Sequence, residues 1–211
     1  MKSLKNISMD MYESHSAVPK LIKLKNGQIA MLRTVRPEDA IKIKEMHDRL
    51  SLASLYFRYL YAYKPRLEDM QRLSQQDDCS GAAFVAILQD GLETIIGLSN
   101  YRVNPRQPDV AEPAVIVDDH FQRQGLGSAL LERLRLHAAA RGIRAFQAFI
   151  LPSNNRIRRL IAHSSLAYDS KYNWEQGVLE VILPLAASVP ATSALNIRTC
   201  PETIPGSWCC Q

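Results

Sequence analysis

The sequence lacks any long hydrophobic run. No stretch approaches the ~18 apolar residues that a membrane-spanning helix requires. Lys2, Lys5, Asp10 and Glu13 interrupt the region where a secretory signal peptide would need an apolar core. We therefore expect a cytoplasmic protein that does not cross a membrane.

Cysteine is also scarce. The chain has 4 cysteines, of which Cys79 stands alone and Cys200, Cys209 and Cys210 lie near the C-terminal end. These residues show neither the two-plus-two spacing nor the histidine partners of a zinc site. We expect no bound metal and reduced thiols, which agrees with a cytoplasmic location.

Neither positive nor negative charge is concentrated in one part of the sequence. The 26 basic and 21 acidic residues give a net charge of +5, whereas a nucleic-acid-binding domain would be expected to carry a basic stripe with interleaved aromatic residues. Arg156, Arg158 and Arg159 do cluster, but their spacing is helical, and the simplest interpretation is a solvated helix face. Nucleic acid is therefore not expected as a partner.

The chain is long enough for one domain with short extensions. Its 211 residues are 46% hydrophobic, which suffices to bury a full core. Residues 1–19 are polar and unpatterned, and residues 186–211 are rich in Ala, Ser, Thr and Pro with little periodicity. We predict that both ends are disordered and that the domain spans residues 20–185.

Strand and helix patterns alternate within this domain. Asn26-Gly27 and Asp90-Gly91 are turn signals that predict two antiparallel hairpins. The expected strands are 21–35 (a hairpin), 82–88, 94–103, 110–117, 144–150 and 178–183, and the expected helices begin at Pro37, Ser51, Arg66, Gly127 and Asn154. This order predicts an α/β fold with a mixed, largely antiparallel sheet flanked by helices. The aromatic residues Tyr56, Phe57, Tyr59 and Tyr61 fit either core packing or a substrate rim.

The stretch 115–131 is the most informative, because an apolar strand enters a basic turn that opens into a helix. Gly125 and Gly127 let the backbone turn without a Cβ in the way, and the first N–H groups of the helix then point at an anion. The sequence has neither the Gly-Lys-Ser/Thr pattern of a nucleotide-triphosphate loop nor the three spaced glycines of a dinucleotide loop. The pattern predicts a phosphate or pyrophosphate site. The alternative is a plain tight turn between strand and helix.

Gln122, Gly125 and Gly127 form a Gln-x-x-Gly-x-Gly pattern that resembles the loop of the GNAT superfamily of acyl-CoA-dependent N-acyltransferases. The chain is most similar to the bacterial protein-lysine acetyltransferase (Pat-like) domains of that superfamily. Matching segments recur in the same order at 25–28, 32–40, Glu112, the glycine loop, Asn155 and 177–181. The resemblance implies the GNAT fold and transfer of an acetyl group from acetyl-CoA to a primary amine, most of all a protein lysine. A homodimer is compatible with it.

The resemblance also implies the cofactor contacts. Main-chain groups of Val115 and Val117 would pair with the pantetheine arm and the thioester carbonyl, and residues 123–128 would cradle the pyrophosphate. Asn155 would approach the CoA arm, with a helix-cap role as a compatible alternative. The full set of expected cofactor-binding residues is Val115, Ile116, Val117, Gln122, Arg123, Gln124, Gly125, Leu126, Gly127, Ser128 and Asn155.

Glu112 is the candidate general base. A lysine amine has a pKa of about 10.4, so near pH 7 only ~0.1% or less is the reactive free base, and a carboxylate that removes the proton becomes the main catalytic group. Glu112 lies on the expected cofactor strand and matches the general-base glutamate of Pat-like domains. Pro113 beside it has no N–H, so this strand should not be fully paired there. The alternative is a surface carboxylate paired with Arg102 or Arg106.

One position departs from the family pattern. Many GNAT enzymes carry a tyrosine, about four residues before a Gly-Phe pair, as the general acid for the departing thiolate. Here the aligned position is Ile161 and the pair reads Ser165-Leu166. Either the thiol, with a pKa near 8.5, leaves without a dedicated acid, or Tyr168 or Tyr172 substitutes. Two other functions stay open: acetylation of a small amine, and a catalytically silent CoA-sensing module.

Overall fold

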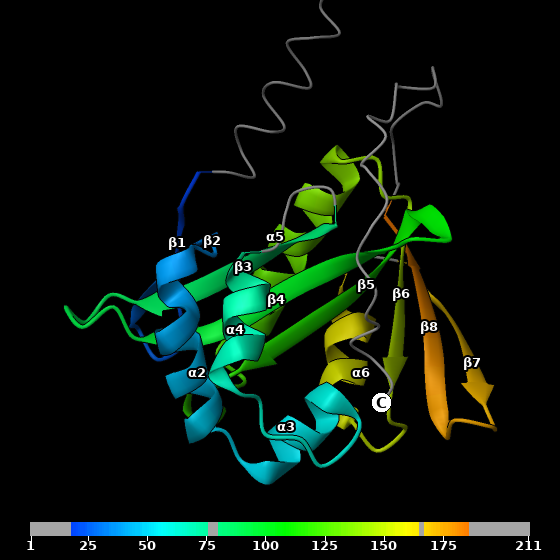
Figure 1. Ribbon diagram of the computed structural model, residues 1–211, viewed down its shortest axis with the longest axis horizontal. Helices are drawn as coiled ribbons and strands as arrows, with labels where there is room; N and C mark the ends of the chain where they lie inside the picture. The colour runs from blue at the N-terminus through cyan, green and yellow to red at the C-terminus, as the bar shows by residue number, and fades with distance from the viewer. Residues whose placement is uncertain (1–17, 76–79, 165–166, 186–211) are drawn as a thin grey trace, which may run out of the picture.

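An eight-stranded sheet forms the centre of the computed structural model, which describes residues 18–75, 80–164 and 167–185 (Figure 1). The strands lie in the order β1-β2-β3-β4-β5-β6-β8-β7. Their bounds are β1 Lys20–Lys23, β2 Ile29–Thr34, β3 Gly81–Leu88, β4 Ile95–Asn104, β5 Gln107–Val117, β6 Ala145–Ile150, β7 Asp169–Asn173 and β8 Val178–Pro184. All neighbours are antiparallel except β5 and β6. The predicted mixed, largely antiparallel sheet is confirmed.

Helices cover both faces of this sheet (Figure 1). Helices α2 (Ala40–Arg49), α3 (Leu52–Tyr59) and α4 (Leu67–Ser74) pack on one face, and α5 (Leu126–Ala140) and α6 (Asn155–His163) pack on the other. Leu98 and Ile116 face the first group, while Val115 and Val117 pack with α5. This alternation follows from the two-residue period of a strand.

The local signals act as predicted. Asn26-Gly27 and Asp90-Gly91 turn between paired strands, with positive φ at Gly27 and Gly91. Pro37 begins the short 3-10 turn η1 (Pro37–Asp39) before α2. Ser51 caps α3, because its side chain accepts a hydrogen bond from the Ser54 amide at 3.2 Å.

Three features differ from the expectation. Strand β5 begins at Gln107 rather than at residue 110. Strand β7 was not predicted, because its polar sequence shows no apolar alternation; it is the last strand of the sheet and is held by backbone pairing with β8. Tyr61 lies beyond α3, which ends at Tyr59 when Leu60 adopts a φ of +66°. The predicted disordered ends, 1–19 and 186–211, lie outside the described residues except for Val18 and Pro19.

A close approach between α5 and β4 sets the position of the functional loop. Gly97 of β4 lies under Leu126 and Leu130 of α5, and a Cβ at this glycine would be 2.9 Å from Leu130 Cδ1. Only glycine allows the helix to lie this near the sheet without a shift of the leucine. The N-terminus of α5 is thereby held near the end of β5.

Candidate active site

Strands β5 and β6 separate after a short contact. Their parallel pairing is confined to Val110 with Ala145 and Ala111 with Phe146. Beyond Ala111 the two strands diverge, and the described residues place no further strand pairing on that edge of β5 (Figure 1). The result is a wedge, defined by residues 112–117 of β5 and 147–150 of β6. Beyond Ala111, this side of β5 has no neighbouring strand among the described residues.

The opposite edge of β5 stays paired. The ladder to β4 continues from Ala111 to Val117, and Pro113 takes part in it opposite Tyr101. The proline therefore does not interrupt the pairing with β4, and the predicted gap lies on the β6 side. Val115, Ile116 and Val117 pack their side chains against the core. A ligand in the wedge would therefore meet their backbone.

The turn after β5 has the backbone shape of an anion site. Arg123 and Gly125 both have positive φ, +61° and +88°, and Gly125 is the N-cap of α5. The first helical hydrogen bond at this end runs from the Ala129 amide to the Gly125 carbonyl at 3.2 Å. The amides of residues 126–128 precede it and have no intrahelical acceptor, so they can bind an anion. Ser128 is exposed and does not cap the helix.

Gly127 has no packing role inside the protein. A Cβ at this position would meet nothing closer than the methyl groups of Leu160 at 3.8 Å, which is an ordinary contact. Beside it, a hollow of about 230 Å³ lies between α5 and α6 and includes Ser128, Arg135 and His163 in its lining. A bulky ligand that follows the amides of α5 has room to continue into this hollow.

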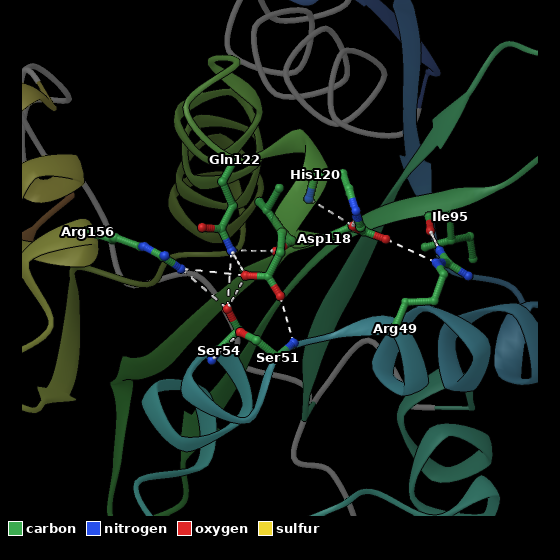
Figure 2. Close-up of polar contacts among 10 residues, drawn as sticks. Arg49, Ser51, Ser54, Ile95, Asp118, His120, Gln122 and Arg156 are labelled. Atoms are coloured by element: carbon green, nitrogen blue, oxygen red, sulfur yellow. Dashed lines mark hydrogen bonds and ion pairs between the residues drawn. The ribbon is translucent and has the colours of Figure 1, made fainter.

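Two glutamines fix the loop rather than extend from it. Gln122 Nε2 lies 3.1 Å from the Val117 carbonyl, 2.8 Å from Asp119 Oδ1 and 3.2 Å from Ser54 Oγ (Figure 2). Gln124 Oε1 accepts a hydrogen bond from the Asn26 amide at 3.0 Å. Their side chains tie the turn to β5, α3 and the first hairpin. The exposed side chain of Arg123, by contrast, is directed to solvent.

Asp119 is a hub that the sequence reasoning missed. Its carboxylate accepts hydrogen bonds from the Ser51 amide at 2.7 Å and from Ser54 Oγ at 2.6 Å, and it lies 3.6 Å from Arg156 Nη1 (Figure 2). Burial alone would raise the pKa of Asp119, but these hydrogen bonds and the charge of Arg156 outweigh it and lower the pKa. The group is therefore an anion near neutral pH.

The neighbouring Asp118 anchors the loop to a different helix. This buried carboxylate accepts from Arg49 Nε of α2 at 3.1 Å and from the His120 amide at 3.1 Å. The Arg49 guanidinium also donates to the Ile95 carbonyl at 2.8 Å. Two aspartates directly after a strand and before a helix are a turn and capping signal, and that pattern could have drawn attention to both residues.

The structure separates Asn154 from Asn155. Asn154 is the N-cap of α6, because its buried Oδ1 accepts from the Ile157 amide at 3.2 Å. The alternative cap role for Asn155 is therefore wrong. Asn155 is the first helical residue, and its exposed side chain lies 3.4 Å from Arg158 Nη1. It is placed at the end of α6 that borders the wedge.

Glu112 is the first residue of β5 beyond the contact with β6. It is half-buried and lies opposite Arg102 in the ladder to β4, whereas Arg106 lies in the turn beyond. By strand alternation its side chain shares the face of Ile116, which α2, α3 and α4 cover. On that face Asn100 accepts a hydrogen bond from Arg58 of α3 at 3.1 Å. Glu112 therefore lies between the wedge and the α3 side of the sheet.

The aromatic residues around α3 divide between the two roles considered. Tyr59 packs against the core, and its hydroxyl lies 3.0 Å from Nε2 of the buried His47. Burial lowers the pKa of His47 to about 4, so this histidine is neutral near pH 7. Tyr56 and Tyr61 remain exposed. Tyr59 therefore belongs to the core, whereas Tyr56 and Tyr61 lie at the surface.

No tyrosine replaces the general acid at its aligned position. Ile161 is buried in the core beneath α6, and Ser165 and Leu166 lie outside the described residues. Tyr172 packs edge-on against Trp174 with ring centroids 4.6 Å apart, and Tyr168 is exposed.

In the described part of the chain, no helix is long and apolar enough to span a membrane, and no cluster of His, Cys, Asp and Glu could hold a metal ion.

Comparison with known proteins shows the family to which the chain belongs. The model of the acetyltransferase (GNAT) family matches residues 49–164, more than half of the chain. The chain therefore belongs to the GNAT family, and it is an acyl-CoA-dependent N-acetyltransferase by its fold and its relatives.

Two curated relatives of the chain are both acetyltransferases. The chain is 30% identical over 141 residues to Acetyltransferase PA5475 of Pseudomonas aeruginosa, covering 65% of this chain and 74% of that protein. It is 26% identical over 141 residues to Acetyltransferase Pat of Mycolicibacterium smegmatis, covering 66% of this chain. The match spans only 42% of that Pat protein.

Solved structures agree. The GNAT domain of S. lividans PAT superposes with a TM-score of 0.72 at 26% identity, covering 81% of this chain and 98% of that domain. A diaminobutyrate acetyltransferase from Paenibacillus lautus, in complex with L-2,4-diaminobutyric acid and coenzyme A, superposes with a TM-score of 0.60 at 20% identity, covering 77% of this chain and 99% of that one. The second likeness concerns the fold alone.

Proposed function

We propose that this N-acetyltransferase acts on lysine side chains of cytoplasmic proteins, with Glu112 as its general base. The observation that carries the proposal is the place of Glu112, which is the first residue of β5 past the contact with β6 and faces α3. A thioester in the wedge and an amine arriving from the α3 side would meet beside this carboxylate. A positioned base is what the reaction needs, since the amine is mostly protonated near pH 7.

Each group in the site has a defined task in this proposal. The amides of residues 126–128 and Arg123 bind the pyrophosphate of acetyl-CoA, and the backbone of residues 115–117 aligns its pantetheine arm. Glu112 accepts a proton from the lysine ammonium, and the free amine attacks the acetyl carbonyl. A C–N bond forms, the C–S bond breaks, and the thiolate of CoA leaves and takes up the second proton, which the attacking nitrogen releases as it becomes an amide. The position that aligns with the family's tyrosine is Ile161, whose side chain cannot donate a proton in this last step.

The open character of the α3 side supports a macromolecular acceptor. Leu52 and Tyr56 lie one turn apart on α3, and 85% and 45% of their surfaces are exposed. Exposed apolar side chains beside a site fit contact with another protein better than an enclosed pocket for a small amine. The similarity to the GNAT domain of S. lividans PAT favours the same choice.

An acceptor panel tests the proposal. The purified chain would be incubated with acetyl-CoA and, separately, with folded bacterial proteins, lysine peptides, spermidine and L-2,4-diaminobutyrate. Release of CoA thiol and mass spectrometry would report transfer, and we expect acetyl-lysine on folded proteins at the highest kcat/KM. Faster transfer to a small amine would support the small-molecule alternative. Binding of CoA with no transfer to any acceptor would support the silent CoA-sensing module.

A further inference from the structure

The carboxylate of Asp119 connects three elements that the reaction must coordinate. On one side it accepts from Gln122 Nε2 at 2.8 Å, at the start of the glycine loop. On the other side it holds the first turn of α3 through the Ser51 amide and the Ser54 hydroxyl. Arg156, from the first turn of α6, approaches the same carboxylate (Figure 2). A single anion therefore contacts the cofactor loop, the acceptor-side helix and the helix that borders the wedge.

We propose that Asp119 is a positioning residue through which CoA bound at the glycine loop orients α3 and so organises the acceptor side of the site. The proposal rests on the proposed function, because it requires that CoA bind at this loop and that the acceptor approach along α3. It adds a role that neither the loop pattern nor Glu112 supplies.

The connection from loop to acceptor side is continuous. Ser54 is buried and donates to Asp119, so a shift of the carboxylate must move the first turn of α3. One turn further on, Arg58 of α3 donates to Asn100 at 3.1 Å. Asn100 lies on the sheet face that also bears Glu112. A displacement at the loop can therefore reach the neighbourhood of Glu112 through two hydrogen bonds that one turn of α3 connects.

Arg156 provides a means of sensing an occupied loop. Its side chain is 61% exposed and lies 3.6 Å from Asp119 Oδ1 and 3.4 Å from Ser54 Oγ. A pyrophosphate at the start of α5 is a stronger partner for a guanidinium than a carboxylate that already accepts three other hydrogen bonds. Bound CoA would draw Arg156 away, leaving Asp119 to Ser51, Ser54 and Gln122 alone. The contact of α3 with the loop would then tighten.

Hydrogen exchange of the whole chain, with CoA as the probe, tests this coupling without knowledge of the acceptor. In the wild type we expect saturating CoA to slow amide exchange in the loop, residues 122–129, and also in α3, by about fivefold or more. In Asp119→Asn we expect the protection of the loop to remain and the CoA-dependent protection of α3 to disappear. Whichever way the new amide turns, its NH2 group faces a group that donates a hydrogen bond to the carboxylate in the wild type.

Asp118→Asn is the matched control, because Asp118 belongs to the same loop but holds Arg49 rather than α3. It should keep the response of α3 to CoA even if it lowers stability. The ratio of exchange with and without CoA is the readout, since a merely structural loss would speed exchange in both states equally. Should Asp119→Asn fail to fold, Ser54→Ala removes the bond from the α3 side and leaves Gln122 on Asp119.

The possible outcomes are distinct. No protection of the loop by CoA in the wild type would overturn the proposed function itself. Protection of the loop without any response of α3, or an unchanged response in both Asp119→Asn and Ser54→Ala, would overturn the role of Asp119 and leave the proposed function intact. Kinetics on an acceptor found in the panel provide the second readout: loss of the coupling should raise the acceptor KM more than it lowers kcat.

Discussion

The two edges of β5 behave differently although they belong to one strand. Towards β4, pairing runs from Ala111 to Val117 without a break. Towards β6, it stops after Ala111. Unpaired backbone groups are costly unless a partner satisfies them, so the closed edge contributes to folding while the open edge retains hydrogen-bonding capacity for a ligand. Under the proposed function, stability and binding depend on opposite edges of the same strand, and substitutions near the two edges should have separable effects.

The largest expected effect concerns the open edge. Glu112→Gln keeps the shape of the side chain and removes the base, so turnover near pH 7 should fall roughly 10²-fold or more. CoA affinity should be retained. The loss should shrink at high pH, where more of the amine is already free. Steady-state rates of both proteins from pH 7 to 10 would measure this, and equal turnover at pH 7 would remove Glu112 from the mechanism.

The next effect concerns the amides that begin α5. Gly127→Val leaves the interior undisturbed at its Cβ, since the nearest atoms are 3.8 Å away, but it places a side chain where a phosphate would lie. We expect CoA affinity to fall about tenfold to a hundredfold, the range for lost hydrogen bonds to a charged group, while the melting temperature changes little. Calorimetry with CoA would measure it. Unchanged affinity in a folded Gly127→Val protein would contradict the assignment of the loop.

A substitution in β4, next to the paired edge of β5, should instead lower stability more than CoA affinity. Gly97→Ala places a Cβ 2.9 Å from Leu130 Cδ1 and 3.3 Å from Leu126 Cδ2, within a fully packed region. We expect a loss of about 1–3 kcal/mol in the free energy of unfolding, and a smaller loss of CoA affinity than in Gly127→Val, because the new Cβ meets the ends of leucine side chains and not the amides that begin α5. Denaturant unfolding and calorimetry on the same sample would compare the two quantities. Should binding weaken as much as stability, the two edges of β5 would not be independent.

The smallest effect is expected at the C-terminal end. Deletion of residues 186–211, which lie outside the described residues, should leave stability and CoA binding nearly unchanged, because their composition offers no periodic apolar face. Leu185 must be kept, since it is buried and its amide donates to the Arg144 carbonyl at 2.8 Å. A melting temperature that drops by more than a few degrees in the chain ending at Leu185 would place the tail within the folded domain.

Much of the fold could be predicted from local signals. Turn residues such as Asn26-Gly27, the cap at Ser51 and the period of the apolar residues depend on contacts within a few positions of the chain. The polar edge strand β7 could not, because its formation depends on backbone pairing with β8 rather than on its own side chains. The cap of α6 differed by one residue, since Asn154 and Asn155 are chemically equivalent in sequence and only the backbone geometry selects one.

The sequence by itself indicated the class of this protein: an apolar strand, a glycine-punctuated turn and a helix in immediate succession predict an anion site, and the resemblance of this loop to that of the GNAT family implied acyl-CoA as its ligand. Tertiary structure decided which residues surround that site. Ser54, Asp119 and Arg156 are far apart in the chain and meet only because α3 and α6 pack at the end of the sheet where β5 and β6 diverge. Their connection depends on distances between separate elements, and no local pattern of residue types encodes those distances.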